Sequence, residues 1–70
     1  MIDDNTFKKI EILSELKKIR KELGISQMKL ARKVGVSLMS IQLWENSNTI
    51  PTDENIDKLK SVIAELREAK

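Results

Sequence analysis

The sequence contains no cysteine, no histidine and no tyrosine. The absence of cysteine excludes disulfide bonds and thiol nucleophiles, and it fits a protein of the reducing cytosol. The absence of histidine removes the commonest general base and a common metal ligand. The remaining carboxylates, lysines and serines show no spacing typical of a nucleophile–base pair or of metal ligands. We therefore expect that the protein is not an enzyme and needs no metal, no cofactor and no small-molecule substrate.

Long apolar runs are also absent. No stretch approaches the ~20 apolar residues that span a bilayer, and residues 1–4 lack the positive charge and the apolar stretch of a secretory signal. We expect no membrane partner and a cytoplasmic location. A chain of 70 residues has the length of one small domain, residues 1–70, and buries only about 60% of its unfolded surface. Its core should therefore be compact and mostly helical.

Glycine and proline are rare, with two copies and one copy, and they divide the chain into helical segments. Between about Thr6 and Leu23, apolar residues recur at three- and four-residue steps, which predicts an amphipathic helix. Gly24 follows as a left-handed cap. The apolar positions of this helix are Phe7, Ile10, Leu13, Leu16, Ile19 and Leu23.

Three further helices are predicted after this first one. Ser26 caps a helix over residues 27–34, Gly35 permits a sharp turn, and Ser37 caps a third helix. Thr52 caps the last helix. Its apolar positions are Ile56, Leu59, Ile63 and Leu66. Because no strand-like alternation occurs, we expect a compact all-α fold of four helices, or five at most, with an extended C-terminal helix.

Basic residues are concentrated between residues 17 and 33. This segment contains seven basic residues and one acidic residue, Glu22, so its net charge is +6, against +2 for the whole chain. The seven are Lys17, Lys18, Arg20, Lys21, Lys29, Arg32 and Lys33. Such a block is typical of a protein that binds a polyanion such as nucleic acid. A solvated helix face explains the charge alone equally well.

Residues 26–46, SQMKLARKVGVSLMSIQLWEN, have the pattern of a helix-turn-helix, in which two short helices are joined by a turn that contains glycine. Small Ala31 suits the point where the second helix crosses the first closely. Ile41 and Trp44 share one side of the second helix and are expected to anchor it to the core. The other side of that helix would then project away from the core.

This pattern resembles the phage repressor and Cro-like (Xre-type) helix-turn-helix proteins over about residues 13–63. The matching residues are Leu16, Ile19, Arg20, Ser26, Gln27, Leu30, Ala31, Val34, Gly35, Val36, Ser37, Ile41, Trp44, Glu45, Asn46 and Pro51. The resemblance implies a lambda-repressor-like fold. It also implies a sequence-specific transcriptional regulator of double-stranded DNA, expected to be a repressor, that inserts the helix over residues 38–46 into the major groove.

The resemblance implies roles for individual residues as well. Arg20 and Glu45 are expected to form a partly buried structural ion pair. The residues expected to contact DNA bases are Leu38, Met39, Gln42 and Leu43. The residues expected to contact DNA phosphates are Gln27, Lys29, Ser37, Ser40 and Asn46.

A homodimer is expected, because relatives of this type bind paired half-sites about one helical turn apart. The last helix offers Ile63 and Leu66, with Val62 beside them, beyond what the core obviously requires. We expect these three side chains to contribute to the contact between the two copies.

At the positions where relatives carry Gln, Arg, Ser or Lys to read base edges, this chain has Leu38, Met39 and Leu43. In the DNA hypothesis these side chains contact thymine methyl groups. In the alternative, the helix-turn-helix is a scaffold for protein–protein interaction, and the apolar face docks a partner chain or a second copy. In a third interpretation, these three side chains pack against the N-terminal arm or the last helix. Ser47 also replaces the Gly that usually follows Glu-Asn.

Overall fold

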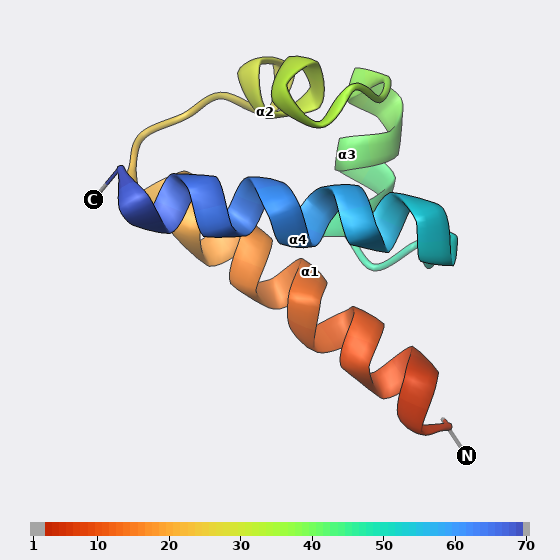
Figure 1. The fold of residues 1–70 in the computed structure, drawn as a ribbon. Helices are drawn as coiled ribbons and strands as arrows, with labels where there is room; N and C mark the ends of the chain where they lie inside the picture. The colour runs from red at the N-terminus through yellow and green to blue at the C-terminus, as the bar shows by residue number, and fades with distance from the viewer. Residues whose placement is uncertain (1–2, 70) are drawn as a thin grey trace.

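Four helices make up the computed structural model, which describes residues 3–69 (Figure 1). They are α1 (Asp4–Glu22), α2 (Gln27–Val34), α3 (Leu38–Glu45) and α4 (Asp53–Glu68). The described residues contain no strand. The prediction of an all-α fold with an extended C-terminal helix is confirmed.

Side-chain caps start the helices. The three predicted caps each accept a backbone N–H three residues ahead: Ser26 from Lys29 at 3.0 Å, Ser37 from Ser40 at 3.1 Å and Thr52 from Asn55 at 3.3 Å. Such a bond satisfies one of the donors that a helix start leaves unpaired. The first helix begins earlier than the predicted Thr6, because Asp3 caps it by accepting the Thr6 N–H at 2.7 Å.

Left-handed backbone conformations end α1 and α2. Gly24, just past the end of α1, has φ +69°, and Gly35, at the end of α2, has φ +87°. The Gly35 N–H donates to the Ala31 carbonyl at 2.8 Å, which closes the last turn of α2. A residue with a β-carbon would be strained at both positions. Gly35 therefore determines the direction in which the chain leaves α2 and enters α3.

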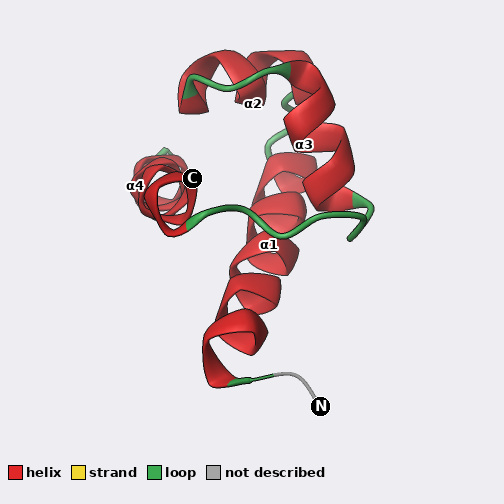
Figure 2. Ribbon diagram, turned by 90° about the vertical axis from the view of Figure 1, so that its right-hand side faces the viewer, coloured by secondary structure: helices red, strands yellow, loops and turns green. Residues whose placement is uncertain are grey.

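The core lies where α1, α3 and α4 meet under α2. Leu16, Leu30, Ile41 and Leu59 are its most deeply buried side chains, one from each helix. Figures 1 and 2 show α4 lying across the C-terminal half of α1, with α2 above the two helices and α3 on the side of α1 away from α4. The N-terminal half of α1 extends beyond the other helices. Lys9 connects this half to the start of α4, because its Nζ donates to the Pro51 carbonyl at 3.0 Å and pairs with Asp53 at 2.9 Å.

Two sequence-based expectations are wrong in detail. Phe7 lies on the predicted apolar face of α1, yet it is 55% exposed. It belongs to the N-terminal half of α1, which extends beyond the other helices (Figures 1 and 2). Val62, Ile63 and Leu66 were expected to offer a dimer surface, but they are only 6%, 4% and 2% exposed. They belong to the monomer core, because α4 packs along α1 and uses its whole apolar face there.

Candidate nucleic-acid interface

The outward face of α3 is mainly apolar. Ile41 and Trp44 are 0% and 5% exposed and hold the opposite side of the helix in the core. At about 100° per residue, Met39 lies farthest from that buried side, and it is 66% exposed. Leu38 and Leu43 are half-buried and are not part of the core cluster. The third interpretation, in which all three are packed away, therefore does not hold for Met39.

The polar residues of the same helix lie around this apolar centre. Gln42 and Asn46 are exposed, and the helical wheel puts both within about 60° of Met39. Ser40 is half-buried at the start of the helix. Its hydroxyl lies 3.0 Å from that of Ser37, and both are close to the first free N–H groups of α3. Glu45 is the one charged residue of α3, and it faces the core.

A buried polar cluster attaches α3 to the first two helices. Arg20 donates from Nε to Oε2 of Glu45 at 2.6 Å and from Nη2 to Oε1 at 2.8 Å, which is a bidentate pair. Arg20 also donates from Nη1 to the Ile25 carbonyl at 2.9 Å. Gln27 donates from Nε2 to Oε1 of Glu45 at 3.0 Å. The side chains of Arg20 and Glu45 are 12% and 2% exposed, so little water competes for these bonds.

The ionisation of Glu45 reflects opposing effects. Burial raises the pKa of its carboxyl, but hydrogen bonds from Arg20 and Gln27, with the charges of Arg20 and Lys17, outweigh burial. The pKa of Glu45 therefore lies below its ordinary value. The carboxylate is charged at neutral pH, and it accepts the hydrogen bonds that connect α3 to α1 and α2.

The structure brings Gln27 to a place that the sequence reasoning did not anticipate. We expected its amide at the start of α2 to point to a phosphate, but it donates to Glu45 on α3. Gln27 is half-buried, whereas Lys29, two positions further along α2, is exposed. Spacing within α2 could not reveal the Glu45 contact, because the two residues are 18 positions apart.

The basic segment offers fewer available cations than its composition indicates. Arg20 is neutralised by Glu45, and Lys33 pairs with Glu65 of α4 at 2.6 Å. Lys29 and Arg32 are exposed on α2. Met28, also on α2 and 50% exposed, was not singled out by the sequence reasoning, although the helical wheel places it off the buried side of α2.

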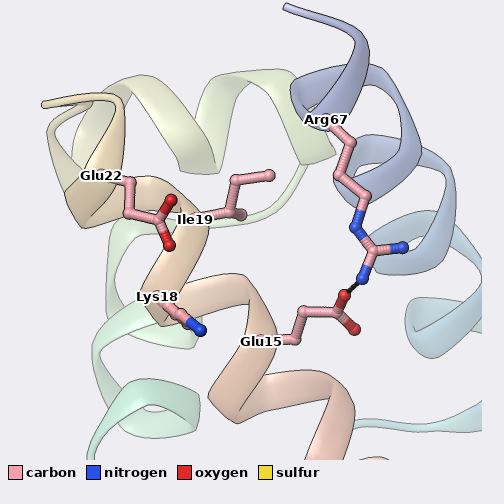
Figure 3. Close-up of a pocket in the computed structure, with 5 residues that line it drawn as sticks. All are labelled: Glu15, Lys18, Ile19, Glu22 and Arg67. Atoms are coloured by element: carbon pink, nitrogen blue, oxygen red, sulfur yellow. Dashed lines mark ion pairs between the residues drawn. The ribbon is translucent and has the colours of Figure 1, made fainter. Parts of the chain in front are cut away.

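A separate hollow lies between α1 and the last turns of α4 (Figure 3). It is lined by Glu15, Lys18, Ile19, Glu22 and Arg67, and the Arg67 side chain reaches across it to an ion pair with Glu15. Charges of both signs line it and its floor is Ile19, which belongs to the core. This arrangement connects α4 to α1.

Among residues 3–69, no helix is long and apolar enough to cross a membrane. In the same part of the chain, no group of three or more acidic, cysteine or histidine residues is arranged to hold a metal ion.

Two short capped helices joined by a left-handed glycine, the second held in the core by one side only, define a helix-turn-helix domain. The profile of the helix-turn-helix family matches residues 16–65, and the chain belongs to this family, in the group of lambda-repressor-like (Xre) proteins. The resemblance found in the sequence is confirmed. The family is one of DNA-binding regulators. Comparisons with curated proteins and with solved structures gave no significant match.

Proposed function

We propose that the protein is a sequence-specific regulator of transcription, acting as a repressor in the cytoplasm, and that α3 enters the major groove of double-stranded DNA. The observation that carries this proposal is the asymmetry of α3. Its Ile41 and Trp44 side is rigidly buried, Glu45 is held by a bidentate arginine, and its opposite side is presented to the outside. A recognition helix needs this combination of a rigid base and a projecting face.

Phosphate contacts would come from the residues that flank α3. Lys29 supplies an exposed charge, while Ser37, Ser40 and Asn46 supply polar groups at the two ends of the helix. Gln27 fits the same role, because an amide nitrogen carries two hydrogens and Glu45 takes one of them. The N-termini of α2 and α3 add backbone N–H groups, which favour an anion. Contacts of this kind position the protein on DNA and carry no sequence information.

Base contacts would come from the outward face of α3. Leu38, Met39 and Leu43 would meet thymine methyl groups, and Gln42 would bond an adenine edge. Because bidentate arginine contacts to guanine are absent from this helix, discrimination would rest on apolar contacts and on Gln42. The preferred site should therefore be rich in A·T pairs at the contacted steps.

The proposal is tested by selecting DNA sites from a genomic pool and measuring affinity at several salt concentrations. Replacing Lys29 with Ala should weaken binding to all sequences alike and lower the slope of log affinity against log salt by about 1. Lys60→Ala is the matched control, because Lys60 is an exposed lysine on α4, outside the helix-turn-helix. A protein that shows no salt-dependent retention on random duplex DNA would contradict the proposal.

A second candidate function is favoured by one observation. Met39, at the centre of the α3 face, is 66% exposed, and the charged residue of this helix is turned inward. An apolar exposed face is typical of a protein–protein contact, so the face would dock a partner chain in that case. Alanine substitutions of Leu38, Met39 and Leu43 would then abolish a protein complex and leave affinity for DNA unchanged.

A further inference from the structure

We propose that α3 reads the C5-methyl group of pyrimidines as such, so that 5-methylcytosine in the DNA site can replace thymine at a contacted position. This inference rests on the proposed function, because it requires α3 to lie in the major groove. It goes beyond that function by naming a modified base as a ligand.

The outward face of α3 offers apolar side chains and no charged group. Met39 lies at its centre with two thirds of its surface exposed, and half-buried Leu43 lies one helical turn further on. The helix has no arginine or lysine to bond guanine. Its acidic group, Glu45, could accept from the amino group of cytosine, but Arg20 and Gln27 already bind both of its oxygens. No charged side chain is therefore available beside Met39 and Leu43, and this part of the face can make only apolar contacts.

Pyrimidine bases differ in whether they display a methyl group in the major groove. Thymine displays its methyl group in the major groove, where apolar side chains contact it. 5-Methylcytosine carries a methyl group on the same ring carbon, but it has an amino group in place of the thymine O4 and pairs with guanine instead of adenine. A side chain that contacts only the methyl group cannot distinguish the two. Unmethylated cytosine and uracil both lack this group, and both should be poor ligands at that position.

The expected size of the effect follows from apolar burial. One methyl group removed from water corresponds to about a three- to fourfold gain in affinity. Two contacted methyl groups should therefore give roughly a tenfold gain. Polar contacts to phosphates do not change between these duplexes, so the gain should be independent of salt concentration.

The experiment compares four versions of one selected duplex that differ at a single contacted base pair: thymine or uracil opposite adenine, and cytosine or 5-methylcytosine opposite guanine. We expect the uracil version to bind about three- to fourfold more weakly than the thymine version, and the 5-methylcytosine version to bind more tightly than the cytosine version by a similar factor. The same exchange outside the contacted steps should have no effect.

Two variants show whether α3 makes the contact. Met39→Ala should bring the thymine-to-uracil ratio close to 1. Met28→Ala removes the same side chain from an exposed position on α2, and it should keep the wild-type ratio. Circular dichroism checks that both variants fold.

The outcomes separate this inference from the function on which it rests. If wild-type protein binds the duplex in a salt-dependent way but does not distinguish the methylated from the unmethylated bases, the inference is wrong and the proposed function remains. If the protein binds no duplex, both are wrong. If Met28→Ala loses the methyl dependence and Met39→Ala keeps it, the assignment to α3 is wrong.

Discussion

At the scale of single residues, Glu45 carries the largest structural consequence. Its carboxylate is 2% exposed and accepts bonds from Arg20 and Gln27, so three segments of the chain meet at one charge. A buried charge that loses its partner is costly because it remains dehydrated and unpaired. The cluster therefore acts less as a source of added stability than as a condition for placing α3 correctly.

We predict that Arg20→Ala, which leaves the Glu45 carboxylate buried without its partner, lowers the free energy of unfolding by about 3–5 kcal/mol. In the Arg20→Ala background, Glu45→Ala should lower the free energy of unfolding much less than it does in the wild type, because it removes the unpaired charge. Denaturant unfolding of the two single variants and the double variant measures this. Glu65→Ala, in the exposed Lys33–Glu65 pair, is the control and should cost less than about 1 kcal/mol. Additive effects below ~0.5 kcal/mol would contradict the role of the cluster.

The lowered pKa of Glu45 predicts a dependence of stability on pH. Because the folded-state pKa lies below the ordinary value of 4.5, the unfolded chain binds more protons than the folded one at acidic pH. The stabilisation should be fully present well above pH 4.5 and should be lost as the pH falls below that value. Thermal unfolding between pH 7 and pH 3 checks this. Asp3 and Asp53 have lowered pKa values too, through Thr6 and Lys9 respectively, and add to the same slope.

Glu45→Gln isolates the contribution of this carboxyl to the acid dependence. The variant should be less stable than wild type at pH 7, and its stability should fall less steeply on acidification. Equal slopes for the two proteins would show that Glu45 does not contribute to the acid dependence.

Ser47 has a left-handed backbone, with φ +61°, a conformation that favours glycine. This conformation costs about 1–2 kcal/mol for a residue with a β-carbon. Glycine removes that cost but loses more backbone entropy on folding, by about 0.5–1 kcal/mol. We predict that Ser47→Gly raises stability by up to about 1 kcal/mol. Ser61→Gly is the control, because Ser61 is exposed within α4, and it should lower stability by about 0.5 kcal/mol. A lower Tm for Ser47→Gly would count against this account.

At the scale of elements, α3 has one side buried in the core and one side exposed. We predict that Met39→Ala changes the free energy of unfolding by less than about 0.5 kcal/mol, as expected of an exposed residue. Leu43→Ala should cost little more, since Leu43 is only half-buried. Both variants should relax the DNA sequence preference measured by competition with random duplex. Ile41→Ala, on the fully buried side, should cost about 2–5 kcal/mol. A similar cost for Met39→Ala would assign that side chain to the core.

The N-terminal half of α1 differs from the rest of the fold. It lies mostly before the region that matches the family, residues 16–65, and it leaves Phe7 55% exposed. Lys9 attaches it to the loop before α4 through the Pro51 carbonyl. This half of the helix therefore contributes less apolar burial than its periodicity suggests.

At the scale of the whole molecule, a homodimer remains our proposal, but Val62, Ile63 and Leu66 are buried and do not form its surface. Two copies are expected because one helix-turn-helix reads only a few base pairs. Phe7 and Ile50 are 55% and 42% exposed and lie outside the helix-turn-helix, so a dimer contact should involve them.

We predict that sedimentation finds two copies of the protein on a duplex with two half-sites. Phe7→Ser should weaken that pairing without changing binding to a single half-site. A monomer both free and on its DNA site would contradict the dimer.

The sequence by itself determined the parts of this protein that depend on near neighbours. Helical periodicity, the Ser26, Ser37 and Thr52 caps, and the turn at Gly35 are local, because each involves residues within four positions of one another. The burial of Ile41 and Trp44 followed from the same periodicity, since their shared side must meet the core.

Tertiary structure alone decided which side chains are free for function. Phe7 is exposed, Leu66 is buried, Gln27 binds Glu45, and Lys33 pairs with Glu65, although nothing in the local pattern indicates these outcomes. Each depends on where a helix distant in the chain ends or crosses, and residues 18 or 32 positions apart come together only by packing. The periodicity of a helix defines its apolar side, whereas the lengths and crossings of its neighbours decide how much of that side is covered.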